Sequence, residues 1–211
     1  MKYIFLIILI ALGMFLYQNN EHTAVKNIDN NITKGIKMEV DKNIKKQWER
    51  LFKYYAGNLS KKCEGATEKK IAEVEKEFGV KLPKAFADSF RICDERYIFN
   101  TSEKKGWFGE HDHYSLTNIF YGGYNLSETN KEIRIYAEDW KDEWISFYNY
   151  EGWYDAILDT KTEQIYLKST TENEYIIWAN SYEEWLEMAV DEVLKHGEIR
   201  LELIEKLMGI E

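Results

Sequence analysis

The chain has 211 residues, of which 45% are apolar and 31% are charged, and its formal net charge is −9. This length allows one domain of ordinary size with a short extension, and the composition excludes intrinsic disorder. The single proline and the 12 glycines exclude collagen-like and low-complexity repeats.

The charge is distributed unevenly along the chain. Residues 21–62 carry ten Lys or Arg against five Asp or Glu, whereas residues 63–211 carry seventeen against thirty-two. Because an acidic body repels phosphate backbones, we expect no nucleic acid among its partners. Such a body attracts basic partners, although the same charge also serves solubility.

Residues 1–18 contain an uninterrupted apolar run, YIFLIILIALGMFLY at residues 3–17. As a helix the run spans about 22 Å, less than the roughly 30 Å hydrocarbon core of a bilayer, but a locally thinned bilayer accepts it. We therefore predict a signal anchor at residues 1–18 and a single-pass, membrane-anchored protein. The alternative is a cleaved signal that releases a secreted protein, but the residues after the run do not suit cleavage.

Residues 19–39 are rich in Asn, Lys and Asp and show no apolar period, which predicts a flexible polar linker. Residues 40–211 are predicted to form the folded domain. Its two cysteines, Cys63 and Cys93, are too few for a disulfide scaffold and lack the spacing of metal ligands.

Three helices are predicted at the start of the domain. Residues 40–55 place apolar side chains on one helical face. A second helix covers residues 67–78, with a threonine N-cap at its start and a glycine just past its end. The only proline begins a third helix, residues 83–93, so the Leu82–Pro83 step makes a sharp bend between the two.

Short apolar runs after Tyr97 predict strands, and residues 106–123 are the longest predicted loop. The predicted strands are Ile133–Tyr136, Trp144–Tyr150, Ala156–Asp159, Ile165–Leu167 and Tyr175–Trp178. Their connections are short and hold no crossover helix, so we expect antiparallel pairing.

Two more helices are predicted at the end of the chain. Ser181 and Glu184 form a capping box, and His196–Gly197 ends the helix that follows. A last helix covers about residues 198–208. Helices, then a mainly antiparallel sheet, then helices predict an α+β fold.

Three segments carry a resemblance to a known family. Residues 71–90, IAEVEKEFGVKLPKAFADSF, combine an amphipathic helix, a Leu-Pro bend and an aromatic helix. Residues 144–167, WISFYNYEGWYDAILDTKTEQIYL, are central strands around a glycine turn, and residues 179–193, ANSYEEWLEMAVDEV, are a closing helix. In this order, over residues 40–195, they resemble the SUKH superfamily of the cell-wall-assembly-regulator type.

The resemblance implies a binding module rather than an enzyme. Bacterial members are similar to immunity proteins that neutralise toxins, often nucleases, delivered by contact-dependent systems, and fungal relatives act as regulatory interaction proteins. We therefore expect an immunity-type protein that binds a basic toxin domain. The alternative is a membrane-attached structural or regulatory scaffold for an envelope partner. Two features depart from the family pattern: Cys93-Asp94-Glu95 stands where members often have Asn-Gly, and the apolar N-terminus is additional.

The best candidate for partner binding is the acidic and aromatic segment 138–144. Its carboxylates suit the steering of a basic partner and its tryptophans suit anchoring, unless one or both tryptophans lie in the core. The candidate residues are Glu138, Asp139, Trp140, Asp142 and Glu143. Trp107, beside Phe108, and the run Trp153-Tyr154-Asp155 are second choices.

No cofactor is expected, because the sequence has neither a nucleophile motif nor a glycine-rich phosphate loop. His111-Asp112-His113 would place two imidazoles on one face of a strand, but no third ligand has a suitable spacing. We therefore expect a polar loop there rather than a metal site.

Overall fold

The computed structural model describes residues 39–55, 63–94, 97–99, 104–106, 112–113, 125–150, 152–171 and 174–209. The chain divides after Glu39, and all the helices and strands described belong to the unit Val40–Glu211. The predicted signal anchor and all but the last residue of the predicted linker lie outside these residues. None of the described helices is long and apolar enough to cross a membrane.

The first three helices are α2 (Lys42–Tyr55), α3 (Glu68–Phe78) and α4 (Lys84–Ile92), as predicted to within two residues at their starts. Thr67 caps α3, because its Oγ1 accepts the N–H of Lys70. Gly79 ends α3 with a φ of 68°, a left-handed conformation that favours glycine. Pro83 stands one position earlier than expected, as the N-cap of α4.

A five-stranded antiparallel sheet follows, in the order β3-β4-β5-β6-β7. Its strands are β3 (Asp112–His113), β4 (Trp144–Tyr150), β5 (Tyr154–Asp159), β6 (Ile165–Ser169) and β7 (Tyr175–Ala179). A separate antiparallel pair is formed by β1 (Tyr97–Phe99) and β2 (Lys104–Gly106). The predicted antiparallel pairing is confirmed. The predicted loop 106–123 contains strand β3. The motif His111-Asp112-His113, expected in a polar loop, contributes its last two residues to that strand.

The prediction of a strand at Ile133–Tyr136 is wrong, because these residues end helix α5 (Leu126–Tyr136). Asn125 caps this helix, its Oδ1 accepting the N–H of Glu128 at 2.8 Å. The alternation of apolar letters in Ile133–Tyr136 does not reflect burial in a sheet, since Ile135 and Tyr136 are 74% and 81% exposed. The overlooked signal is the run Asn-Leu-Ser-Glu at residues 125–128, which has the spacing of a helix cap.

The chain ends with α6 (Tyr182–His196) and α7 (Leu201–Met208). Ser181 Oγ accepts the N–H of Glu184, as the capping box predicts. The carboxylate of Glu184 reaches back to the N–H of Asn180, one residue before the expected position.

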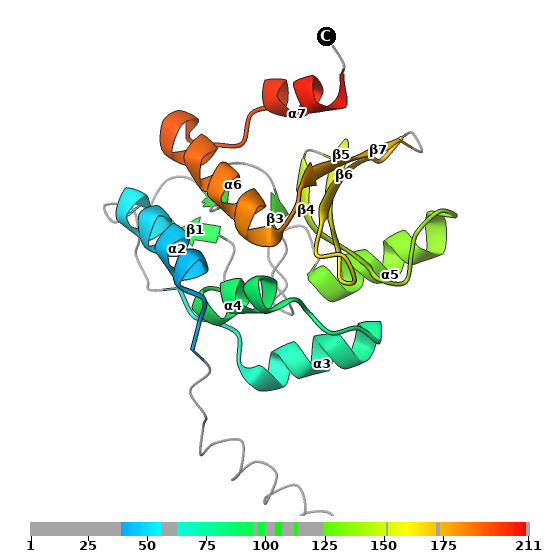
Figure 1. Cartoon of the computed structure of the whole chain (residues 1–211), viewed down its shortest axis with the longest axis horizontal. Coiled ribbons are helices and arrows are strands. Elements are labelled where there is room, and N and C mark those ends of the chain that lie inside the picture. Colours follow the sequence, from blue (N-terminus) through cyan, green and yellow to red (C-terminus); the bar gives the residue numbers. More distant parts are fainter. Residues whose placement is uncertain are drawn as a thin grey trace, which may run out of the picture. The chain divides into compact units, whose positions relative to one another are not determined.

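Helices α2, α4 and α6 cover one face of the sheet, and α5 lies on the opposite side (Figure 1). Phe147 of β4 contacts the rings of Phe86 in α4 and Trp185 in α6, at centroid distances of 5.5 and 4.8 Å. Both Trp48 Nε1 and the hydroxyl of Tyr182 donate to Ser89 Oγ at 2.9 Å, which ties the three helices together. The main core therefore lies between this helical layer and the sheet.

The two cysteines form a disulfide, which the sequence did not predict. It joins the segment before α3 to the end of α4, where the N–H of Ala66 also donates to the carbonyl of Phe90 and the N–H of Asp94 to that of Glu64. One crosslink is no scaffold, but it fixes the segment before α3 to the buried end of α4.

Buried Asp88 in α4 joins the same region through polar contacts. Its carboxylate accepts the N–H of Asp41 and an Nη1–H of Arg91, both at 2.7 Å, and pairs with Lys84. Burial alone would raise the pKa of Asp88, but these three hydrogen bonds outweigh it and lower the pKa below its usual value. Asp88 is thus a charged group that the folded state stabilises.

Candidate partner-binding site

The outer face of the sheet, opposite the main core, carries a row of polar side chains. Successive residues of a strand point to opposite faces, so Leu158 enters the core whereas Asp155 and Ile157 face outward. The register places Asp155 between Asn149 of β4 and Lys168 of β6. Three polar side chains from three neighbouring strands therefore lie side by side.

The side-chain amide of Asn130 fastens helix α5 to this face. Among the described residues, β3 pairs only with Tyr148 and Asn149 of β4, so it does not reach Ser146. The side chain of Asn130 takes its place: Oδ1 accepts the N–H of Ser146, and Nδ2 donates to the carbonyls of Ser146 and Leu126, all at 2.8 Å. This contact positions the end of α5 and the segment that follows over the outer face.

A cleft of about 510 Å³, here called the sheet cleft, opens between that segment and β6. Its walls are Glu132, Ile133, Tyr136–Trp140, Asp155 and Lys168–Thr171. The lining includes four carboxylates and one ammonium group, so it has an excess of negative charge. Tyr136, almost fully exposed, stands at its rim.

Two of the charged groups in the sheet cleft are nearly buried. Lys168 is 6% exposed, and its Nζ lies 3.2 Å from Oδ2 of Asp139. Asp155 is 8% exposed, and its Oδ1 accepts hydrogen bonds from Asn149 Nδ2 at 2.9 Å and Ser146 Oγ at 3.1 Å. Burial raises the pKa of Asp155, and the two hydrogen bonds and the charge of Lys168 offset this only in part.

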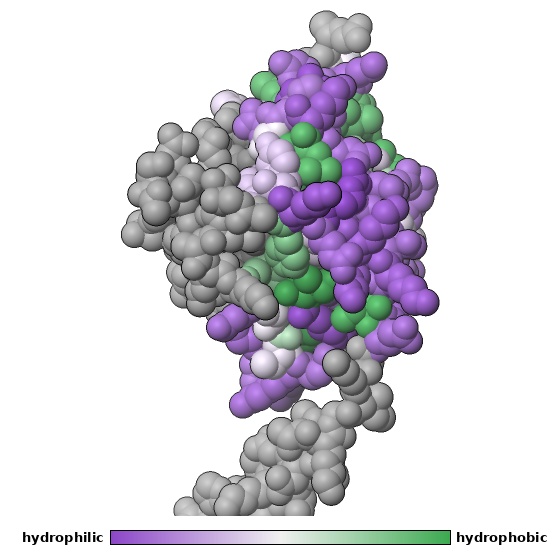
Figure 2. Space-filling view, turned by 90° about the vertical axis from the view of Figure 1, so that its left-hand side faces the viewer, coloured by the Kyte–Doolittle hydropathy of each residue, from purple (hydrophilic) through white to green (hydrophobic). Residues whose placement is uncertain are grey.

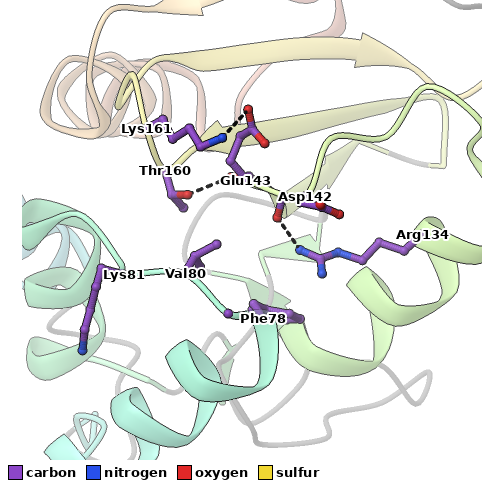
Figure 3. Close-up of a pocket in the computed structure, with 9 residues that line it drawn as sticks. Phe78, Val80, Lys81, Arg134, Asp142, Glu143, Thr160 and Lys161 are labelled. Carbon is purple, nitrogen blue, oxygen red and sulfur yellow. Dashed lines mark hydrogen bonds and ion pairs between the residues drawn. The ribbon is translucent and has the colours of Figure 1, made fainter.

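A second cleft of about 490 Å³, here called the bend cleft, is lined by Phe78–Lys81, Arg134, Asp142, Glu143, Thr160 and Lys161. Figure 3 shows Arg134 reaching from α5 to the backbone of Asp142, where Nη2 donates to the carbonyl at 2.8 Å. The guanidinium carbon lies 5.2 Å from the ring centroid of Phe78. Lys161 Nζ lies 3.3 Å from the carboxylate of Glu143. These contacts fix Asp142 and Glu143 to the neighbouring elements, so side chains that line the bend cleft already serve the packing of the domain.

The predicted site residues of segment 138–144 are divided between the two clefts. The sheet cleft contains Glu138, Asp139 and Trp140, and the bend cleft contains Asp142 and Glu143. Trp107 lies outside the described residues.

The tryptophans at residues 140 and 144 have different environments. Trp144 is fully buried, with its ring 5.7 Å from that of Trp140 and 5.3 Å from that of Tyr175. The Nζ of Lys141 lies 4.4 Å above the same ring, within the range of a cation–π contact. The alternative that one tryptophan is buried is thus correct for Trp144, whereas Trp140 is half-buried in the wall of the sheet cleft.

The second-choice residues are also separated. Trp153 is 58% exposed in the turn between β4 and β5, and its carbonyl accepts the N–H of Thr170, a residue of the sheet cleft. Tyr154 is half-buried and packs against the core. Tyr154 and Asp155 both belong to strand β5, whereas Trp153 lies in the turn before it.

Among the charged and aromatic residues that line the sheet cleft, the sequence analysis missed three: Lys168, Glu132 and Tyr136. A lysine within the apolar strand Ile165–Ser169 is the signal that could have revealed the first. The other two lie on α5, a helix of which only Ile133–Tyr136 had been predicted to have regular structure, as a strand. Among the residues whose positions are described, no group of three or more His, Cys, Asp or Glu could hold a metal ion.

A group of exposed lysines lies away from the sheet cleft. Lys42, Lys45, Lys46 and Lys53 are exposed on α2. Figure 2 looks at the side on which α2 lies in Figure 1, and most of the described surface there is hydrophilic, with hydrophobic residues only in small groups. The acidic sheet cleft is thus on a different part of the molecule from this basic helix.

No curated protein matches the chain in sequence. The model of the SMI1/KNR4 family (SUKH-1) matches residues 65–188, more than half of the chain. The match includes α3, α4, α5, all the described strands and the first half of α6, and so contains both clefts. The chain therefore belongs to the SMI1/KNR4 family (SUKH-1), which confirms the resemblance found in its sequence.

Proposed function

We propose that this protein is a non-catalytic binding module that neutralises a basic toxin domain, as immunity proteins do. Membership of the SMI1/KNR4 family indicates an immunity-protein-like or cell-wall-related module and is consistent with a protein partner. The sheet cleft carries the proposal, because it combines negative charge with aromatic side chains at one place on the surface.

The chemistry of this surface suits a basic protein. Carboxylates at the rim accelerate encounter with a positively charged partner and fix its orientation. Large aromatic side chains supply most of the binding energy at protein interfaces. Tyr136 and Ile135, both highly exposed at the end of α5, offer apolar area beside the acidic lining.

We further propose that the protein is held at a membrane by residues 1–18 and that the folded body is in an oxidising compartment. The disulfide between Cys63 and Cys93 supports this location, because disulfides persist outside the cytoplasm and are rare within it. On that side of a membrane the body would meet a toxin, such as a nuclease, before the toxin reached the cell interior.

The proposal is tested by capture with the full chain in detergent micelles. Products of neighbouring reading frames are offered at low and high salt, and the bound proteins are identified. We expect one basic protein to bind in a 1:1 complex that salt weakens. Capture of an envelope protein in place of a toxin would favour the scaffold or regulatory function, and release of a modified small molecule from the complex would contradict a non-catalytic role.

Charge reversal locates the interface. Glu132 and Glu138 line the sheet cleft, are exposed, and make no ion pair with any described residue, so Glu132→Lys with Glu138→Lys leaves the fold intact. We expect the pair to weaken capture at least tenfold, an order-of-magnitude estimate for two reversed rim charges. Glu187→Lys, an exposed change on α6, is the matched control and should bind normally. Equal capture by all variants would remove the sheet cleft as the interface.

A further inference from the structure

We propose that the sheet cleft receives the side chain of an arginine from the partner, and that Asp155 is the carboxylate that binds its guanidinium group. This inference rests on the proposed function, because it names the chemistry by which a basic partner is recognised.

The first argument is an unsatisfied oxygen at the base of the cleft. Both hydrogen bonds to Asp155 end on Oδ1, and no hydrogen bond reaches Oδ2 from any residue that the structure describes. The side chain is more than nine-tenths buried, yet it lines the cleft. Oδ2 is not one of the fully buried atoms that lack a partner, so it is open to the cleft, where a bound guanidinium would supply two N–H groups.

The second argument is the local charge. Lys168 is the cross-strand neighbour of Asp155, but its ammonium group is paired with Asp139. Glu132 and Glu138 line the same cleft without a counter-ion among the described residues. The lining therefore remains negative after the internal ion pair is counted, and one added cation reduces this excess.

The third argument is protonation. Burial raises the pKa of Asp155, so its ionised form is disfavoured while the cleft holds only water. A cation beside the carboxylate stabilises the ionised form and recovers this cost. Binding of a neutral group would bring no such gain.

The choice of arginine over lysine follows from the shape and composition of the walls. The rings of Tyr136 and Trp140 line the cleft above the sheet. A planar guanidinium stacks on aromatic rings while it donates two parallel hydrogen bonds to a carboxylate, which a compact ammonium group does not do. A volume of about 510 Å³ is sufficient for one long side chain.

The test uses a small probe and the full chain in detergent micelles. Blocked arginine amide is titrated while NMR follows the side-chain amide of Asn149 and the indole N–H of Trp140. Blocked citrulline amide, which has the same shape without the charge, is the matched probe. We expect arginine to shift both signals with a dissociation constant on the order of 1 mM, and citrulline to leave them unchanged. Equal binding of citrulline, or tighter binding of blocked lysine amide, would overturn the proposal.

A variant pair tests the residue. Asp155→Asn preserves an acceptor for Ser146 and Asn149 but removes the charge, and it should weaken arginine binding at least tenfold. Asp159→Asn changes another buried aspartate on the same strand that lines neither described cleft, and it should bind like the parent. Binding by Asp155→Asn within twofold of the parent refutes the assignment. If Asp155→Asn does not fold, the comparison of arginine with citrulline on the parent protein decides whether the cleft binds a guanidinium group.

This experiment separates the inference from the proposed function. Arginine binding at Asp155 without capture of any toxin would leave the site in place and remove the immunity function. Capture of a toxin by a protein that does not bind the arginine probe would remove the arginine site and leave the immunity function in place.

Discussion

The stability of the folded body should depend strongly on the Cys63–Cys93 disulfide. The bond joins residues 30 positions apart in the sequence. Closing a loop of this length removes conformational entropy from the unfolded chain, and the chain-entropy relation gives about 3.6 kcal/mol at 25 °C. Domains of this size have a total stability of about 5–15 kcal/mol, so the disulfide supplies a large fraction of it.

The best perturbation is Cys63→Ala. Cys93 is fully buried and packs in the core, so replacing it would add a packing defect to the loss of the crosslink. Cys63 is partly exposed, and its replacement leaves the core packing of Cys93 in place. The backbone hydrogen bonds between residues 64–66 and the end of α4 also remain possible.

Unfolding in urea, followed by tryptophan fluorescence on the full chain in detergent, measures the effect. We expect the oxidised parent to lose about 3.6 kcal/mol on Cys63→Ala, and the reduced parent to match the variant. Reductant should not change the variant itself. A loss below about 1 kcal/mol, with thiol labelling showing that the parent had been oxidised, would refute the reasoning.

Three further changes test the packing described above, each by the free energy of unfolding. Asn130→Ala should cost about 2–4 kcal/mol because it leaves two backbone groups of β4 without partners, whereas Thr129→Val should not lower stability, since its buried hydroxyl has no partner among the described residues. Equal effects of the two would show that the amide of Asn130 is not what holds α5. Gly65→Ala should cost about 1–3 kcal/mol, because its Cβ would lie 1.9 Å from a carbonyl oxygen of α4, and a variant as stable as the parent would contradict this close approach. The pKa of Asp88 is lower in the folded state, so its contribution to stability is complete above the unfolded value of about 4 and is lost as the pH falls through the folded value. Asp88→Asn should accordingly lower stability at pH 7 and reduce its fall below about pH 4, and an unchanged acid profile would rule out this role.

The arrangement of the sheet explains why one face holds the core and the other a binding site. Helices α2, α4 and α6 bury most of the inner face, which forms the main core. Among the described residues, α5 and the segment after it cover part of the outer face, and the sheet cleft opens beside them. Loops and helix ends in this position can differ between relatives without disturbing the core.

The sequence by itself determined the features that depend on neighbouring residues. Thr67 and Ser181 were identified as caps, and Gly79 and Gly197 as helix ends, because a cap needs only a side chain and an N–H two or three residues away. Antiparallel pairing of β4 to β7 followed from short connections alone. These signals, in order along the chain, were also enough to indicate the family.

Only the tertiary structure decided the features that depend on distant residues. The apolar letters of Ile133–Tyr136 suited a strand, whereas in the structure they end a helix that the amide of Asn130 joins to Ser146 of β4. The pairing of the two cysteines needed α4 to fold back on the segment before α3. Asp155 and Lys168 became neighbours through strand register, and a shift of one residue would have turned both toward the core. The candidate site therefore could be predicted only in its acidic and aromatic segment, since its base exists only after the strands have paired.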